Sequence, residues 1–165
     1  MYRARHNCAQ LKHMDDSQLQ LSNQVCFPIY SVSRLITKAY KPYLDEMGIT
    51  YPQYLVLMVL WENNSLTVNQ IGEQLLLNTN TLSPLLKRME ISGIIARNRS
   101  ENDERSVIVQ LTEKGKQLKV NAKPIPEKLL KILVNENIKL NEVLQLKDML
   151  NQWIEILTEN DNKTQ

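Results

Sequence analysis

Six polar or cationic side chains in the middle of the chain are of the types that contact nucleic acid. They are Thr79, Asn80, Thr81, Ser83, Lys87 and Arg88. Hydroxyl, amide and cationic donors bind base edges and phosphate oxygens. The segment 79–99 contains four cationic residues and one acidic residue, so its net charge is +3, whereas the whole chain has a net charge of only +2. A charge cluster alone is more often a solvated face, but this one lies where a phosphate backbone would run if the surrounding elements bind DNA.

Those surrounding elements are predicted to form a helix-turn-helix. Thr67-Val68-Asn69-Gln70 has the spacing of a capping box, so a helix is expected to begin there. The polar break Asn78-Thr79-Asn80 ends this helix and offers caps for a second one, in whose first turn Pro84 would cost little. One apolar stripe at helical spacing leaves the six polar residues on the opposite face. The stripe consists of Leu82, Leu85, Leu86 and Met89.

A β-hairpin is predicted to follow the second helix. Gly93 is suited to end that helix, because glycine tolerates the left-handed conformation. Two strand-like runs, 94–99 and 106–111, then flank a polar tip. Two helices followed by such a hairpin make a winged helix-turn-helix, with double-stranded DNA as the expected partner. Arg99 and Arg105 border the tip of this wing and are predicted to contact DNA as well.

Composition excludes several other classes of protein. The chain has 165 residues, 42% of them hydrophobic and 23% charged, which is typical of a globular protein in water. Its longest apolar run, residues 54–61, is far shorter than the roughly 20 residues of a bilayer-spanning helix. No secretory signal is visible, so no membrane partner and a cytoplasmic location are expected. Two cysteines and two histidines form neither a disulfide framework nor a metal cluster, and no cofactor is predicted.

Further helices are predicted on both sides of the winged helix-turn-helix. Residues 25–47 are amphipathic, residues 52–62 are apolar on nearly all sides, and apolar stripes recur over 118–133 and 140–157. A small core cannot cover all these faces. An intertwined homodimer would cover them, and its two-fold symmetry would place the two second helices in successive major grooves of a palindromic operator. The alternative is a compact monomer that folds its C-terminal helices onto itself.

The predicted fold class is therefore mainly α, a winged helix-turn-helix with N- and C-terminal helices that form the dimer. Met14 is a second candidate for the start of the natural chain. The expected organisation is a flexible arm 1–20, an N-terminal dimerisation helix 21–50, a DNA-binding domain 51–111, C-terminal dimerisation helices 112–160 and a disordered tail 161–165.

Several short motifs resemble one known family. Residues 82–90 (LSPLLKRME), 103–106 (DERS) and 111–115 (LTEKG) resemble the MarR family of dimeric bacterial repressors. Residues 25–27 (VCF), 40–42 (YKP) and 49–54 (ITYPQY) are similar to its OhrR branch, the organic-hydroperoxide sensors. The resemblance runs from about Leu21 to the last helix.

The resemblance implies a peroxide-sensing thiol at Cys26, hydrogen-bonded by Tyr40 and Tyr51 of the partner subunit. Tyr40 lies 14 residues beyond Cys26, roughly 21 Å along one helix, so the two can meet only across a dimer. Organic hydroperoxide would convert the thiolate to a sulfenic acid and release the operator. Because no cysteine follows Cys26, a small cellular thiol is expected to cap the oxidised sulfur, and Cys8 could replace it only if the N-terminal arm belongs to the natural chain and is mobile.

Three alternatives stay open. Free cysteine is often a small buried hydrophobe, so Cys26 would then have no redox role. In that case a phenolic or other small aromatic ligand, bound between the dimer and DNA-binding lobes, would release the DNA. A thiol peroxidase is disfavoured, since the sequence offers no resolving cysteine and no basic residue beside Cys26.

Overall fold

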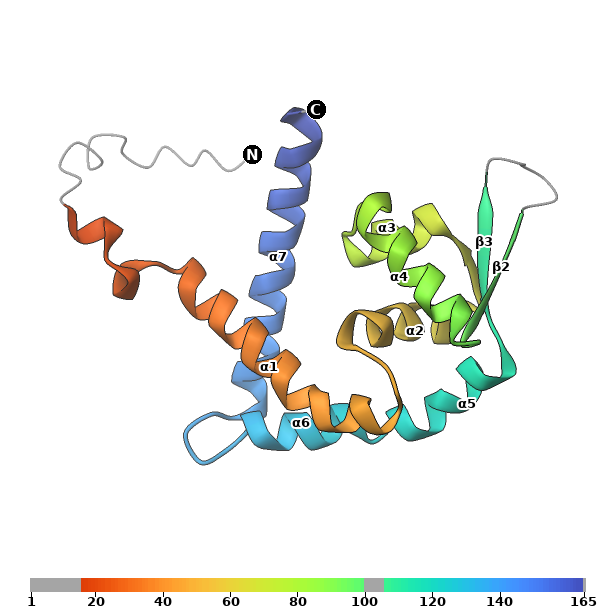
Figure 1. Ribbon diagram of the computed structural model, residues 1–165. Helices are drawn as coiled ribbons and strands as arrows, with labels where there is room; N and C mark the ends of the chain where they lie inside the picture. Colours follow the sequence, from red (N-terminus) through yellow and green to blue (C-terminus); the bar gives the residue numbers. More distant parts are fainter. Residues whose placement is uncertain (1–15, 100–105, 165) are drawn as a thin grey trace. The chain divides into compact units, whose positions relative to one another are not determined.

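A computed structural model describes residues 16–99 and 106–164, and the chain divides into two units, 1–39 and 40–165, within the first long helix. The fold is mainly helical with one small sheet, as expected (Figure 1). Its elements are η2 (Asp16–Leu19), η3 (Leu21–Asn23), α1 (Cys26–Glu46), α2 (Tyr51–Asn63), β1 (Ser65–Thr67), α3 (Val68–Leu75), α4 (Thr79–Ile91), β2 (Ile95–Arg99), β3 (Val107–Leu111), α5 (Glu113–Ala122), α6 (Ile125–Leu133) and α7 (Leu140–Thr164).

The caps of α3 and α4 form as the sequence predicts. The hydroxyl of Thr67 accepts from the backbone N–H of Gln70 at 3.2 Å, and the Gln70 side chain accepts from the Thr67 N–H at 2.9 Å. The Asn78 side chain accepts from the N–H of Thr81 at 2.9 Å. Gly93, at φ +70°, follows the end of α4 in the left-handed conformation. These contacts satisfy backbone groups that helix ends otherwise leave unpaired.

The prediction for Pro84 was wrong. This residue lies inside α4, beyond its first turn, because the helix begins at Thr79. A proline has no N–H, so the carbonyl of Asn80 lacks its i+4 donor within α4. The helix nevertheless continues to Ile91, since the predicted stripe on its inner face is fully packed. Leu82, Leu86 and Met89 are 0% exposed and Leu85 is 5% exposed.

The wing belongs to a three-stranded antiparallel sheet in the order β1-β3-β2. In its register both Leu66 of β1 and Arg97 of β2 lie opposite Val109 of β3. β1 was not predicted from the sequence. It has only three residues and merges with the capping box of α3, and its partner strand is distant in the chain, so no local alternation reveals it.

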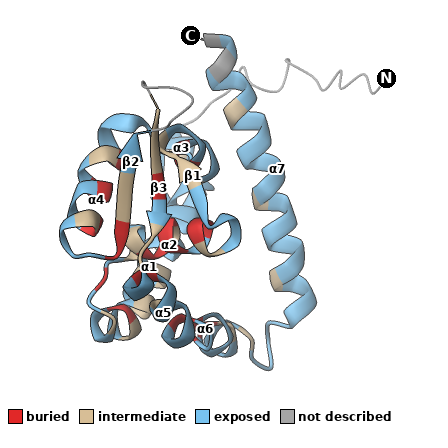
Figure 2. Ribbon diagram, turned by 90° about the vertical axis from the view of Figure 1, so that its right-hand side faces the viewer, coloured by how far each residue is buried: buried red, intermediate tan, exposed pale blue. Residues whose placement is uncertain are grey.

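The core lies between α2, α3, α4 and the sheet (Figure 2). α2 is buried on several sides, as its continuous apolar run predicts, and Val56, Leu57 and Leu60 are 0% exposed. Ile71 of α3 and Val109 of β3 complete this core. The DNA-binding elements predicted from the sequence thus share one packed interior.

Two predicted boundaries differ from the structure. α7 continues to Thr164, beyond the predicted start of a disordered tail at residue 161, because this polar end contains no proline or glycine to stop a helix. In the predicted arm, Asp16–Leu19 forms a 3₁₀ turn, and the Asn23 side chain donates to the carbonyl of Ser17 at 2.7 Å. Residues 1–15 lie outside the described part. Over the described ranges, no helix is long and apolar enough to cross a bilayer.

Candidate functional site

The polar face of α4 presents the six predicted side chains. Thr79, Asn80, Thr81, Lys87 and Arg88 are exposed and Ser83 is half-buried. Arg99, the last residue of β2, is exposed as well, whereas Arg105 lies outside the described residues. The buried stripe of α4 therefore leaves on its other face donors suited to base edges and phosphates.

A groove of about 220 Å³ runs between α4, the wing and the first turn of α3. It is lined by Thr67, Val68, Asn69, Thr79, Ser83, Arg97, Ser106 and Val107. The contribution of the first turn of α3 was not predicted from the sequence. The capping box marks where that helix starts, but only the packing of α3 against α4 shows that this end faces the wing.

Arg97 lies in the groove and pairs with an acidic residue of α4. Its guanidinium donates two hydrogen bonds to the Glu90 carboxylate, from Nη2 at 2.6 Å and from Nε at 2.9 Å. These hydrogen bonds hold the pKa of Glu90 below its ordinary value. Arg97 therefore ties β2 to α4. Its charge is partly neutralised, although the sequence pattern counts it with the other basic residues.

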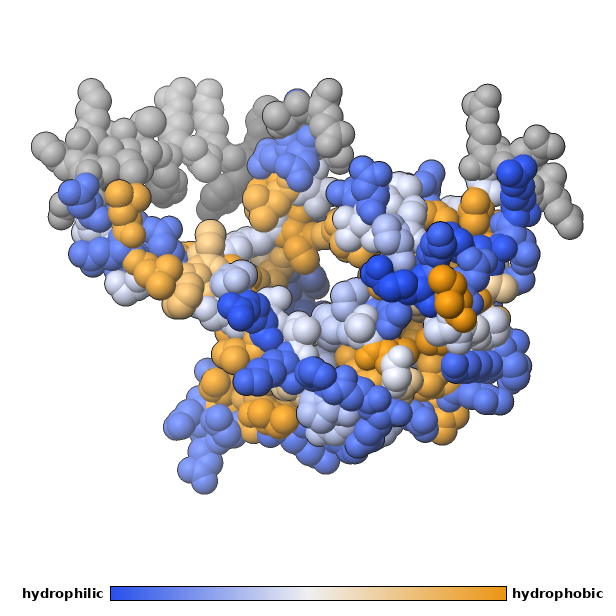
Figure 3. Space-filling view, in the orientation of Figure 1, coloured by the Kyte–Doolittle hydropathy of each residue, from blue (hydrophilic) through white to orange (hydrophobic). Residues whose placement is uncertain are grey.

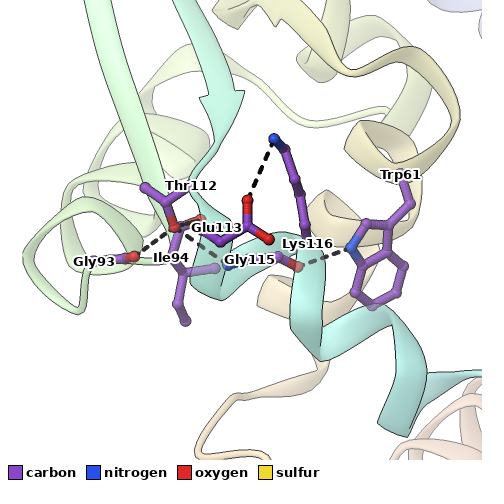
Figure 4. Close-up of polar contacts among 7 residues, drawn as sticks. All are labelled: Trp61, Gly93, Ile94, Thr112, Glu113, Gly115 and Lys116. Atoms are coloured by element: carbon purple, nitrogen blue, oxygen red, sulfur yellow. Dashed lines mark hydrogen bonds and ion pairs between the residues drawn. The ribbon is translucent and has the colours of Figure 1, made fainter.

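The LTEKG segment forms a junction between the wing and α5 (Figure 4). The Thr112 hydroxyl caps α5 by accepting from the N–H of Gly115 at 3.2 Å. The same oxygen lies 2.7 Å from the Gly93 carbonyl and 2.9 Å from the Ile94 carbonyl, where β2 begins. A Cβ on Gly115 would lie only 2.2 Å from the Ile94 carbonyl oxygen. The motif thus needs a hydroxyl and then a glycine three residues later.

Trp61 of α2 joins this junction from the other side. Its indole Nε1 donates to the carbonyl of Gly115 at 3.0 Å (Figure 4). The Lys119 ammonium donates to the carbonyl of Trp61, also at 3.0 Å. α2 and α5 are thereby held together by hydrogen bonds in both directions.

The two predicted tyrosines lie side by side in a cluster with a third. The ring centroids of Tyr40 and Tyr51 are 5.0 Å apart, and Tyr54 lies 5.5 Å from Tyr40 and 6.3 Å from Tyr51. Burial, reinforced by the neighbouring phenols, raises the pKa of Tyr40 to about 12, and burial also raises the pKa of Tyr51 and Tyr54. The phenols therefore remain hydrogen-bond donors at neutral pH.

Tyr54 was not among the predicted site residues, although it follows Tyr51 by one helical turn. Cys26 is the first residue of α1 and its side chain is exposed. It belongs to the unit 1–39, whereas the tyrosines belong to the unit 40–165. The structure thus brings together the two predicted phenols and adds a third.

Groups of large hydrophobic side chains on α1, α6 and α7 remain exposed in the single chain. Figure 3 shows such side chains at the surface around the start of α1 and along α7. They include Ile29, Val32 and Leu35 of α1, Ile132 and Leu133 of α6, and Leu144, Met149, Trp153, Ile156 and Leu157 of α7. Ala122, Ile125 and Leu129 are buried instead, so the predicted stripe over 118–133 is covered only in its first part.

Comparisons with known proteins identify the family. Residues 38–122 match the model of the SarA/Rot transcriptional regulators. The chain is 50% identical over 139 residues to the organic hydroperoxide resistance transcriptional regulator of Bacillus subtilis, covering 84% of this chain and 92% of that protein.

Solved structures agree with these matches. AbfR, a Staphylococcus epidermidis protein solved in its reduced form bound to DNA, is 39% identical with a TM-score of 0.71, covering 86% of this chain and 98% of AbfR. Overoxidised AbfR bound to DNA gives a TM-score of 0.68 at 40% identity, covering 87% and 99%. The apo MarR of E. coli, at 24% identity and a TM-score of 0.62 over 78% of this chain and 95% of MarR, shares the fold. The chain therefore belongs to the MarR family of transcriptional regulators and, within it, to the OhrR branch.

Proposed function

We propose that the protein is a dimeric repressor that binds DNA and releases its operator when an organic hydroperoxide oxidises Cys26. The observation that carries this proposal is the 50% identity with the Bacillus subtilis organic hydroperoxide regulator over most of both chains. The clustering of Tyr40 and Tyr51, the phenols that the resemblance assigns to the sensor, supports it independently.

DNA binding is assigned to α4 and the wing. The exposed amide and hydroxyls of Thr79, Asn80, Thr81 and half-buried Ser83 are suited to base edges in the major groove. Lys87 and Arg88 extend from the same helix as candidate phosphate contacts. Arg99, the last residue of β2, and Arg105, which lies outside the described residues, are assigned to the flanking phosphate backbone. AbfR, which is 39% identical to this chain, binds DNA in its solved structure, and this supports the assignment.

A homodimer is supported by the exposed apolar faces of α1, α6 and α7. Large side chains such as Leu35 and Leu157, at 63% and 64% exposure, are costly to leave in water over whole helices. A second copy offers the same faces and would bury both. Two-fold symmetry would then match the two α4 helices to the half-sites of a palindromic operator.

The dimer also makes the sensor geometry possible. Cys26 opens α1 and Tyr40 follows in the same helix, where 14 residues of helical rise amount to roughly 21 Å. The thiol of one subunit can therefore reach the phenol of Tyr40 only in its partner. Protonated phenols would donate hydrogen bonds to the Cys26 thiolate and stabilise the reactive form.

The sensing reaction is a two-electron oxidation of sulfur. The thiolate attacks one peroxide oxygen, an S–O bond forms while the O–O bond breaks, and the departing alkoxide takes a proton to become an alcohol. The added oxygen would disturb the phenol hydrogen bonds and shift the helices of the dimer. A small cellular thiol would then condense with the sulfenic acid to give a mixed disulfide and water, because no cysteine follows Cys26.

An anisotropy titration of labelled operator DNA tests this function. Reduced protein should bind, one equivalent of cumene hydroperoxide should release the DNA, and a thiol reductant should restore binding. Cys26→Ser should bind with the wild-type affinity and ignore peroxide. Release of the Cys26→Ser protein by peroxide would remove the thiol from the mechanism, and turnover of many peroxide equivalents per subunit would favour a peroxidase.

A second candidate function is release by a small aromatic ligand, with Cys26 incidental. An open cavity of about 850 Å³ favours it, lined among others by Leu76 and Leu77 beside α3 and by Ile154 and Leu157 of α7. A phenolic acid added to the reduced Cys26→Ser protein distinguishes the two functions. Operator release in that experiment would support the ligand-controlled regulator.

A further inference from the structure

Trp61 is the middle member of a continuous series of contacts between the tyrosine cluster and the wing. On one side Tyr54 packs against both Tyr40 and Tyr51. The next contact is edge-on, since the rings of Tyr54 and Trp61 lie 6.1 Å apart at 69°. Such an arrangement of aromatic rings is favourable and depends on orientation.

On its other side Trp61 holds the junction from which the wing starts. The hydrogen bond from its indole Nε1 fixes the carbonyl of Gly115. Gly115 in turn lies directly against Ile94, with no space for a Cβ. Thr112, which caps α5 at Gly115, also contacts the carbonyls of Gly93 and Ile94 at the end of α4 and the start of β2 (Figure 4).

Resting on the proposed function, we propose that Trp61 is a positioning residue that couples the phenols of the peroxide sensor to the DNA-binding wing. Close-packed interiors transmit a displacement instead of absorbing it. If Tyr54 moves when its neighbouring phenols lose the thiolate, the indole ring must tilt. The Gly115 carbonyl then follows the indole or loses its donor, and in either case the base of β2 moves relative to α2.

Trp61→Phe separates coupling from folding, because phenylalanine retains a ring edge for Tyr54 but has no N–H for Gly115. The readout is the ratio of the operator Kd after and before one equivalent of cumene hydroperoxide. We expect the reduced Kd to stay within about threefold of wild type and the ratio to fall about fivefold, as expected from the loss of one neutral hydrogen bond. Asn63→Ala is the matched control, because it also removes one side-chain hydrogen bond of α2, to the carbonyl of Val59 at 2.9 Å, but lies outside this series of contacts and should keep the wild-type ratio.

A spectroscopic experiment follows Trp61 directly. In the Trp153→Phe background Trp61 is the sole tryptophan, so the fluorescence emission reports the environment of its indole. The measurement is made on the protein in the absence of DNA. We expect peroxide to shift this emission, and we expect no shift when Cys26→Ser is added. This measurement keeps the indole in place, so it decides the question even if Trp61→Phe folds poorly.

Two results overturn the coupling role alone. One is wild-type release together with an unchanged ratio in Trp61→Phe. The other is operator release by the Trp153→Phe protein without any change in Trp61 emission. A wild-type protein that keeps its operator after oxidation of Cys26 overturns the proposed function, and the coupling role with it.

Discussion

Gly115→Ala sets helix propensity against packing at the junction between the wing and α5. Gly115 lies in the first turn of α5, where alanine is intrinsically better than glycine by about 1 kcal/mol. Propensity alone therefore predicts a more stable protein. The structure predicts the opposite, because the new Cβ would lie 2.2 Å from the Ile94 carbonyl oxygen and 3.0 Å from a methyl carbon of Leu111.

The size of the effect follows from how this clash can be relieved. Ordinary C···O contacts are roughly 3.3 Å or longer, so the first turn of α5 has to move by about 1 Å. Such a movement breaks the hydrogen bond from Trp61 and the contact of Thr112 with Ile94, about 1 kcal/mol each. Overpacking against rigid backbone adds about 3 kcal/mol. After the gain in propensity, the net loss is about 4 kcal/mol.

Urea denaturation followed by circular dichroism measures this loss, with all proteins at one concentration because a dimer's stability depends on it. Gly48→Ala is the matched control. It stands at φ +67° with no atom within 4 Å of its Cβ, so only backbone strain of about 1 kcal/mol is expected. A Gly115→Ala protein as stable as wild type, or more stable, would refute the rigid junction.

Four further changes test separate parts of the structure. Arg99→Gln should weaken binding equally on specific and random DNA and lower by about 1 the slope of log Kd against log salt concentration. A loss of affinity confined to one DNA sequence would show instead that Arg99 contacts a base. The pair with Arg97 lowers the pKa of Glu90. The stabilisation that this pair contributes is therefore present above the ordinary carboxyl pKa of about 4.3 and is lost as the pH falls. The urea midpoint of the Glu90→Gln protein should therefore fall less in acid than the wild-type midpoint does. Because the pKa of Tyr40 is raised, the stability that its protonated phenol contributes is present below pH 10 and is lost as the pH rises towards about 12. The urea midpoint of the Tyr40→Phe protein should therefore decline less at alkaline pH than the wild-type midpoint does. Leu76→Asn should raise the free energy of unfolding by up to about 1 kcal/mol, since Leu76 is exposed at φ +53°; an unchanged urea midpoint would show that this turn is not strained.

Much of the proposed DNA-binding surface is predictable because its signals are local. A capping box, a polar break and a stripe at i, i+3, i+4 and i+7 each depend on residues within two helical turns, so α3 and the polar face of α4 follow from sequence. The prediction that Pro84 lies in the first turn of α4 is wrong because the start of that helix is poorly defined by local signals. A first turn is only as well defined as the start of the helix, and Asn78 and Asn80 are both plausible caps by type.

The proposed sensor shows what local patterns do not reveal. Cys26, Tyr40 and Tyr51 enter through resemblance, and helical rise alone separates the thiol from Tyr40 within one chain. Nothing in their spacing reveals that Tyr54 joins the two phenols, because an aromatic residue in an apolar run reads as ordinary core. Its contact with Trp61 lies within α2, seven residues along the same helix, but its contact with Tyr40 depends on how the end of α1 packs against α2.

By itself, then, the sequence determined the helix-turn-helix, the wing strands and the apolar faces that need a second copy, since periodicity and capping are properties of short segments. The tertiary structure alone decided the pairing of β1 with β3, the ion pair of Arg97 with Glu90, the contact of Tyr40 with Tyr54 and the hydrogen bond from Trp61 to Gly115. These contacts join residues from different elements, and their distances depend on packing, which no local pattern of residues encodes.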